Sequence, residues 1–357
     1  EIDDGLGTLE AQLSSYITLA GDIDFSSNTP RSVDIVDHQL DDGDDSVSAL
    51  AVNSLEISVT TGLVFIGNHN GPYILDDSNT AANFEDDTYD PDAVGFEGIV
   101  SSGFSLAILS DEIDTWYVAK GTIASAELKN IEGLDLEAAD LSIELNSASD
   151  GKVIDFSTTS LTLGSITFDF DGADGEKFHA SGTVALNAQG FVMAVGSFDI
   201  FKGSVSATAA EAGVELVNAQ LLSIELSNIE VFVGVGGAFI DNNATGTTTV
   251  TDDDLDTSNA IGFLATVNQL NLALLTQGTT KYTGLEIQGL GASLVGLGSD
   301  FVLEAANVNV LINQVSVVNG TKLNWGSLSS VAADDPLVFS SALTANVELQ
   351  ASGDVAL

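Results

Sequence analysis

The sequence predicts an all-β fold, and three observations carry this prediction. Short runs of apolar residues alternate with polar residues at a period of two, which places one set of side chains on one face of a strand. Glycine, with 35 residues, separates these runs, whereas proline, with 4, rarely interrupts them. No window carries apolar residues at the helical period over several turns.

The clearest strands are expected where β-branched or large apolar residues alternate. These segments are 141–145, 161–163, 166–170, 231–233 and 308–312. Polar, glycine-containing turns are expected between strands, at 146–151, 171–175 and 298–300.

The spacing of the strands favours one architecture over another. Strand starts recur roughly every 7–12 residues, which suits a sandwich or a coil-by-coil solenoid. Small residues at expected inward positions suit a narrow interior; they are Ala124, Ala126, Ala138, Ala292 and Ala305. We therefore expect an elongated β-solenoid-like array of tandem repeats, and a string of β-sandwich domains is the alternative.

An internal repeat sets the expected domain organisation. Ala93-Val94-Gly95-Phe96 recurs as Ala260-Ile261-Gly262-Phe263, a shift of 260 − 93 = 167 residues, and collinear matches run along the chain. They include Phe65 with Phe232, Leu106–Leu109 with Leu272–Leu275, and Asn146 with Asn313. Ala180-Ser181-Gly182 recurs as Ala351-Ser352-Gly353. The expected copies are therefore 1–180 and 181–357, with the start of a third copy at 351–357.

The charge balance excludes several classes of partner. The chain has 53 acidic and 8 basic residues, a formal net charge of −45, which repels nucleic acids and anionic lipids. The longest apolar stretch, 285–297, is shorter than the ~20 residues that cross a bilayer, so no membrane insertion is expected. The chain lacks cysteine, so disulfides contribute nothing. It starts without Met or a basic segment, so we expect a mature or excised fragment of a longer array.

Both copies carry an oxygen-rich loop at the same place in the repeat, between 71–74 and 93–96 and between 237–240 and 260–263. Calcium takes about 6–8 oxygen ligands from carboxylates, amides and carbonyls. The candidate ligands for Ca²⁺ are Asp76, Asp77, Asp86 and Asp87 in the first loop, and Asp241, Asn243, Asp252, Asp253 and Asp254 in the second. The alternative is a solvated loop that serves solubility alone.

The order of motifs in residues 231–313 resembles a known class of repeat. Phe232-Val233-Gly234-Val235-Gly236-Gly237 precedes the acidic loop, and Ala260-Ile261-Gly262-Phe263 and 308–313 follow it. This order is similar to the long tandem repeats of giant repetitive bacterial surface proteins, of the hemolysin-type or adhesin-like kind. The resemblance implies a secreted, cell-surface protein whose loops bind calcium. Thr247-Thr248-Thr249 replaces the more regular Asp/Gly run of those loops.

The residues needed for catalysis are sparse, so we expect no enzyme. His38, His69 and His179 lie far apart, and no G-x-S-x-G elbow occurs. We expect a structural or adhesive segment of a giant extracellular repeat protein, as stalk, filament or surface layer, stabilised by calcium. Its expected partners are neighbouring repeats, copies of itself and cell-surface glycans.

Two alternatives to a structural segment stay open. The first is a calcium-dependent glycan- or cell-binding module. The second is a carbohydrate-active β-helix enzyme with paired carboxylates. The second is less favoured because sugar sites usually need convergent aromatic rings, and the chain has only Trp116 and Trp325 as tryptophans.

Overall fold

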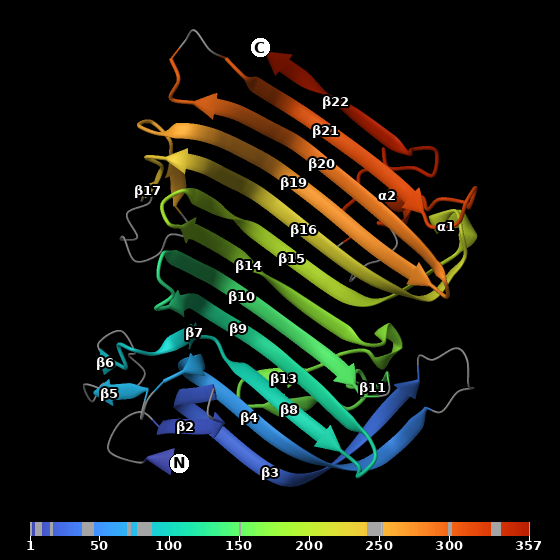
Figure 1. Cartoon of the computed structure of the whole chain (residues 1–357). Coiled ribbons are helices and arrows are strands. Elements are labelled where there is room, and N and C mark those ends of the chain that lie inside the picture. Colours follow the sequence, from blue (N-terminus) through green and yellow to red (C-terminus); the bar gives the residue numbers. More distant parts are fainter. Residues whose placement is uncertain are drawn as a thin grey trace. The chain divides into compact units, whose positions relative to one another are not determined.

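The computed structural model in Figure 1 describes most of the chain. Backbone and side chains are described for residues 18–37, 46–69, 73–74, 90–149, 151–240, 251, 253–298, 302–329 and 337–356, and the backbone alone for 2–3, 9–14, 17, 75–76 and 88–89. Most of the described residues lie in β-strands, as the sequence predicts. The chain divides into two compact units, unit 1 (Glu1–Glu176) and unit 2 (Lys177–Leu357). The sequence repeat places its boundary at residue 180 instead.

Unit 1 is built on an antiparallel sheet. Its strands are β1 (Ile2–Asp3), β2 (Leu9–Ser14), β3 (Ile17–Asp37), β4 (Val47–Asn68), β7 (Val94–Val100), β8 (Phe104–Ser110), β9 (Thr115–Lys129) and β10 (Leu134–Ala148). Each pairs with the next in this order, except that β7 and β8 lie end to end and both bridge β4 and β9.

Short elements cover the two ends of this sheet. β11 (Lys152–Asp155) pairs with β3, and β12 (Leu161–Leu163), β13 (Ile166–Phe168) and the 3-10 turn η1 (Gly172–Asp174) follow it. Their apolar side chains pack on Trp116 and Val118 of β9 and on Leu109 of β8. At the other end, β5 (Ile74–Asp76) and β6 (Thr88–Tyr89) form a two-stranded hairpin.

Unit 2 repeats this strand order. β14 (Lys177–Ala188), β15 (Val192–Ala207), β16 (Leu216–Val235), β19 (Ile261–Gln277), β20 (Thr280–Val295), β21 (Glu304–Val315) and β22 (Leu349–Ala356) each pair antiparallel with the next. β19 takes the place of β7 and β8 together. β17 (Ala238–Ile240) and β18 (Asp254–Asp256) form the hairpin that corresponds to β5 and β6, and the one-turn helices α1 (Ala209–Ala212) and α2 (Trp325–Leu328) lie at the other end.

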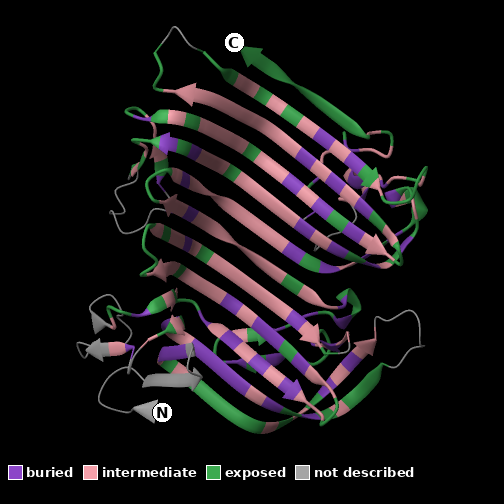
Figure 2. Ribbon diagram, in the orientation of Figure 1, coloured by how far each residue is buried: buried purple, intermediate pink, exposed green. Residues whose placement is uncertain are grey.

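One face of the unit 2 sheet is covered at both ends and is called the inner face here. At one end, Trp325 and Leu328 of α2 with Phe339 and Leu343 pack on Leu275 of β19, in a buried apolar cluster. At the other end, Phe239 and Leu255 of the β17–β18 hairpin pack against Phe232. Figure 2 shows the purple, buried positions concentrated in parts of the strands and not along their whole length.

The opposite, outer face carries rows of apolar side chains. Phe198, Leu226, Leu270 and Ile287 lie opposite one another across β15, β16, β19 and β20. All four are half-buried, because large side chains that lie opposite one another on adjacent strands shield each other from solvent. The alternation that predicts the strands in the sequence therefore separates this outer face from the inner one.

Several details differ from the sequence predictions. Asn146 lies inside β10 and is completely buried, whereas a turn was expected from 146 onward. Of the five small residues expected to line a narrow interior, only Ala138 is buried; Ala124, Ala126, Ala292 and Ala305 are half-buried on open sheets. The antiparallel pairing of sequence neighbours does not confirm the solenoid.

Candidate functional site

Each unit places a buried phenylalanine ring over a pair of facing glycines. Gly67 of β4 lies opposite Gly95 of β7, and a Cβ atom on Gly67 would be 2.3 Å from a backbone oxygen and 2.8 Å from the ring of Phe65. Gly234 and Gly262 repeat this pair in unit 2, under Phe232. Both rings are completely buried. Only glycine leaves room for a ring that lies flat on the sheet.

The groups that cover the two rings differ. In unit 1, Tyr73 stacks on Phe65, with ring centroids 4.1 Å apart and an angle of 18°. The Tyr73 hydroxyl donates to the buried carboxylate of Glu97, and the ammonium of Lys129 lies 3.1 Å from the same carboxylate. In unit 2, Met193 and the backbone at Gly237 cover Phe232 instead. The frame is therefore repeated, and the Tyr73–Glu97–Lys129 contacts are found on its unit 1 copy.

Two of the predicted calcium ligands lie at the β17–β18 hairpin and can be placed in the structure. Asp253 is buried, Asp254 begins β18, and both line a cavity of about 460 Å³ on the inner face of unit 2. Glu230, Asn228 and Thr251 line the same cavity. Carboxylate, amide and hydroxyl oxygens of this kind are the donors that calcium prefers.

The other predicted ligands cannot be placed in the same way. Asp76 ends β5, and its side chain lies outside the described part of the chain. Asp77, Asp86, Asp87, Asp241, Asn243 and Asp252 lie outside the described residues. Within the residues that are described, no group of three or more His, Cys, Asp or Glu side chains is arranged to hold a metal ion.

A band of polar side chains crosses the inner face of unit 2 between its two covered ends. This polar band consists of Ser197, Asp199, Glu225, Ser227, Gln269, Asn271, Glu286 and Gln288, which lie in two adjacent rows across β15, β16, β19 and β20. Glu286 and Asn271 are buried and contact the covering segment: Glu286 accepts from the Ser340 amide at 2.7 Å, and Asn271 donates to the Val338 carbonyl at 2.9 Å.

Burial and one acidic neighbour shift the pKa of Glu225 in this band. Asp199 lies directly opposite Glu225, and the imidazole of His179 is 3.0 Å from Asp199. Burial, and then the charge of Asp199, raise the pKa of Glu225, while a hydrogen bond from Gln269 at 2.9 Å opposes them. The band therefore favours a proton or a cation near Glu225.

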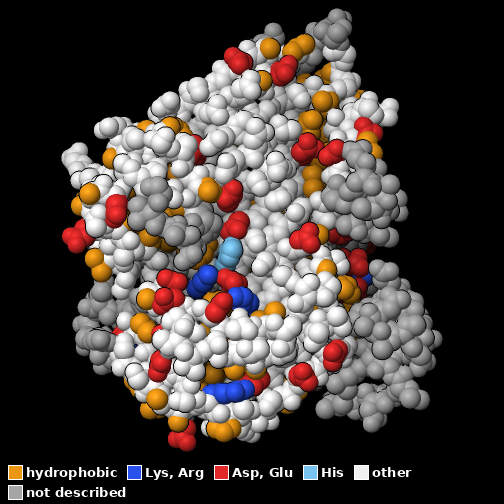
Figure 3. Space-filling model, turned by 180° about the vertical axis from the view of Figure 1, so that it is seen from behind, with side chains coloured by type: hydrophobic (Ala, Val, Ile, Leu, Met, Phe, Trp, Pro, Cys, Tyr) orange, Lys and Arg blue, Asp and Glu red, His pale blue; other side chains and the backbone are white. Residues whose placement is uncertain are grey.

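Unit 1 has a corresponding polar row that includes a basic residue. Asp24, Ser58, Ser105, Lys120 and Glu144 face one another across β3, β4, β8, β9 and β10. Lys120 bridges Asp169 at 2.6 Å and Glu144 at 3.5 Å. Figure 3 shows how the few basic side chains on the face in view lie beside carboxylates.

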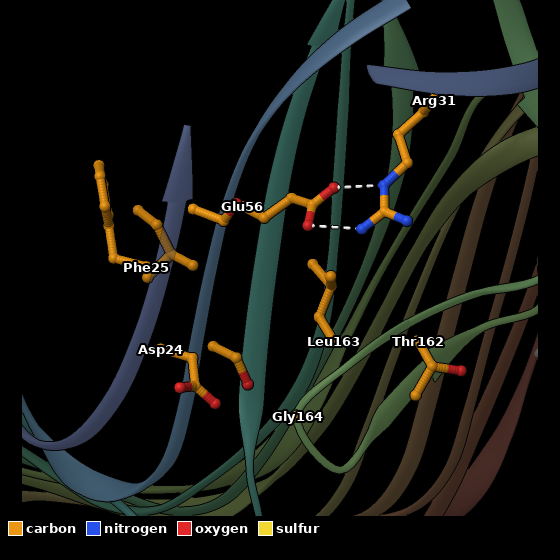
Figure 4. A pocket seen from close by; sticks show the side chains of 10 residues that line it. Asp24, Phe25, Arg31, Glu56, Thr162, Leu163 and Gly164 are labelled. Carbon is orange, nitrogen blue, oxygen red and sulfur yellow. Dashed lines mark hydrogen bonds and ion pairs between the residues drawn. The ribbon is translucent and has the colours of Figure 1, made fainter. Parts of the chain in front are cut away.

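One cavity of unit 1 is built around an ion pair. Arg31 donates through two nitrogens to both oxygens of Glu56, each at 2.7 Å (Figure 4). Ser54 also donates to Glu56. Burial by itself would raise the pKa of Glu56, but the bonds from Arg31 and Ser54 hold that pKa below its ordinary value. Residues of β3 and the β12–β13 turn complete a cavity of about 310 Å³.

Reasoning from the sequence missed these polar rows. The sequence does not mark Arg31, Glu56, Lys120 and Glu225 as buried or paired, because isolated charges in a strand normally face solvent. The alternation Ser54, Glu56, Ser58 inside an otherwise apolar strand is the signal that could have found the first row. In the turn expected at 171–175, the Asp171 side chain accepts from the Ala173 amide and caps η1.

Fold and site together define an all-β protein of two units. In each unit, short elements cover the strand ends of an antiparallel sheet, and polar side chains form rows across the strands. No protein-family model matches the chain, and no curated protein or solved structure is significantly similar to it. Among the described residues, no helix is long and apolar enough to cross a membrane.

Proposed function

We propose that this chain is a structural or adhesive segment of a giant extracellular repeat protein, such as a stalk, filament or surface layer, and that calcium stabilises it. The observation that supports this proposal most is the repetition of one frame. Both units carry the same strand order, the same phenylalanine over facing glycines, and a hairpin with an acidic loop at that place. A single catalytic cleft requires no second copy, whereas a spacer gains length from each one.

The calcium part of the proposal rests on the acidic hairpins. A net charge of −45 makes the chain repel itself, and a divalent cation bound by the loops would relieve this repulsion. In unit 2, Asp253 and Asp254 lie at a cavity lined by further oxygen donors. Calcium bound there would tie the β17–β18 hairpin to the inner face.

Thermal unfolding of the whole chain with calcium, with magnesium and with a chelator tests this part. We expect calcium to raise Tm by several degrees at concentrations where magnesium has little effect. Asp253→Asn with Asp254→Asn should abolish part of this shift. Asp354→Asn, an exposed change of charge in β22, is the control and should leave the shift intact. Equal Tm values with calcium and chelator contradict the calcium proposal.

The same frame suggests how units follow one another. We propose that repeats join end to end into an elongated array, solenoid-like in outline, with a string of sandwich domains as the alternative. Small-angle scattering from chains of two and four units distinguishes either elongated arrangement from a compact one. The maximum dimension should grow in proportion to the number of units.

A second candidate function is calcium-dependent binding of cell-surface glycans. The polar band supports it, because serine, glutamine, asparagine and carboxylate side chains are suitable partners for sugar hydroxyls. A further cavity of about 290 Å³ lies on this band, lined by Glu286, Gln288 and Asn309 among others. A glycan array probed with and without calcium tests this function, and Gln288→Ala should weaken any hit.

A further inference from the structure

The last strand of unit 2 repeats the sequence of its first strand. β22 contains Ala351-Ser352-Gly353 and then Val355-Ala356, and β14 contains Ala180-Ser181-Gly182 and then Val184-Ala185. Two strands with the same pattern of small and branched residues are suited to the same neighbour. β14 therefore indicates which strand β22 would accept.

β14 and β22 differ in how far they are covered. β14 pairs with β15 along its whole length, and nearly all of its residues are buried or half-buried. All eight residues of β22 are exposed, and Val355 is 69% exposed. Among the described residues, β22 pairs only with β21. In Figure 1, β22 is the red strand at the edge of the unit 2 sheet. Figure 2 shows it as exposed along its length.

The pairing of β22 with β21 determines which backbone N–H and C=O groups of β22 point away from β21. The Asn313 amide of β21 donates to the Glu348 carbonyl at 3.1 Å, so the backbone groups of residue 348 face β21. Because backbone groups alternate along a strand, those of Gln350 and Ser352 also face β21, while those of Leu349, Ala351 and Gly353 face outward. An outward row of this kind is a template for another strand.

The side chains of β15 fit β14 by size. Ile200 lies opposite Ala180, Phe198 opposite Gly182, and Gly196 opposite Val184. A large residue meets a small one at each of these positions. The same fit is available on β22, where Ala351, Gly353 and Val355 follow in the same order.

We propose that β22 accepts, by antiparallel strand addition, a strand of the β15 type from a further copy of the repeat. In the register that β14 sets, Ile200 of the added strand lies opposite Ala351, Asp199 opposite Ser352 and Phe198 opposite Gly353. The added strand covers the exposed side chain of Val355 and satisfies the outward backbone groups. This inference deepens the proposed function and rests on it, because it names the partner through which repeats join. Pairing of β22 with β22 of another chain lacks this fit, since in a register centred on Gly353 two glycines would face each other.

Binding of a labelled peptide with the sequence of residues 191–208 to the whole chain tests the proposal. We expect saturable binding by fluorescence anisotropy, and binding at least tenfold weaker for a scrambled peptide. Ala351→Pro removes an outward N–H that β21 does not use, so it should abolish binding while circular dichroism stays unchanged. Ala351→Ser is the matched control and should bind as the parent does.

Cross-linking tests the register, and the absence of native cysteines makes it specific. Ser352→Cys in the chain should form a disulfide with a peptide carrying Asp199→Cys, and faster than with one carrying Phe198→Cys, whose side chain lies on the opposite face. Failure of the peptide to bind better than its scrambled form overturns the proposal. A dimer of the chain that Ala351→Pro dissociates and the peptide does not compete with also overturns it, in favour of β22–β22 pairing. Because the calcium test uses unfolding temperature without the peptide, either proposal can fail while the other stands.

Discussion

The indole N–H of Trp325 donates to the side-chain oxygen of Asn313 at 3.2 Å, and both side chains are completely buried in unit 2. The amide nitrogen of Asn313 also donates to the carbonyls of Leu323 and Thr344, at 2.7 and 2.9 Å. One side chain thus ties β21 to both flanks of the segment that covers the inner face. Asn146, its counterpart in unit 1, makes a simpler contact, donating to the Ile154 carbonyl at 2.9 Å.

Replacing these two asparagines should have unequal effects. Asn313→Ala leaves two carbonyls and the Trp325 N–H buried without these bonds, and we expect a loss of about 3 kcal/mol in the free energy of unfolding. Asn146→Ala removes one bond and should cost about 1–2 kcal/mol. Urea unfolding of the two variants measures the difference. Equal losses would contradict the role assigned to Asn313.

The Arg31–Glu56 pair should make unit 1 sensitive to acid. Glu56→Gln should reduce the free energy of unfolding at neutral pH by about 1–2 kcal/mol, a figure kept low because Arg31 is partly exposed. The folded pKa of Glu56 lies below its ordinary value of 4.5, so its contribution is complete above that pH and is lost as the pH falls through the folded pKa. Asp24 lines the same cavity, and Asp24→Asn is therefore the control. This variant should lose little free energy of unfolding at any pH. A Glu56→Gln deficit that stays constant down to pH 2 would exclude this ion pair as its cause.

Glu225→Gln should act in the opposite direction. The folded pKa of Glu225 is raised by burial and by Asp199, so the protonated form is favoured in the folded state, and the charge becomes a cost as the pH rises through that pKa. We expect the variant to be about 0.5–1 kcal/mol more stable at pH 7 and equal to the parent well below the ordinary value of 4.5. Glutamine keeps an oxygen that can accept from Gln269. Glu304→Gln, at an exposed position, controls for the change in net charge; the same gain there would refute the local explanation.

A methyl group at Gly234 should be poorly tolerated. Its Cβ would lie 2.3 Å from the Ile261 carbonyl oxygen and 2.6 Å from the Phe232 ring, and the backbone contact cannot be relieved by turning a side chain. We expect Gly234→Ala to cost about 3 kcal/mol, at the upper end of overpacking effects. Gly190→Ala is the comparison: nothing lies within 4 Å of its Cβ position, and its φ of +62° alone should cost about 1 kcal/mol. Thermal unfolding checks both. A mild effect at Gly234 would mean that the ring can leave the glycine pair.

Repeated core residues could be predicted from the sequence, whereas the polar contacts that differ between the two units could not. Matches such as Phe65 with Phe232 and Leu109 with Leu275 are visible in the sequence, and all four residues are completely buried. Core positions tolerate few alternatives in size, so they keep their identity when a unit is duplicated. Lys120 faces its polar row in unit 1, whereas the acid Glu286 lies in the polar band of unit 2. Polar positions tolerate such a reversal once the covering segments supply different partners, Asp169 in one unit and the Ser340 amide in the other.

The amino-acid sequence by itself determined the all-β class, the period-two strands and the places where acidic loops interrupt them, because these depend on local alternation and turn chemistry. The tertiary structure alone decided which residues meet across strands. The pairing of Arg31 with Glu56, the opposition of Asp199 and Glu225, and the burial of Asn146 follow from register, which joins residues far apart in the chain. A shift of one residue would move each of these side chains to the other face, so their chemistry depends on the pairing of whole strands and not on any short motif.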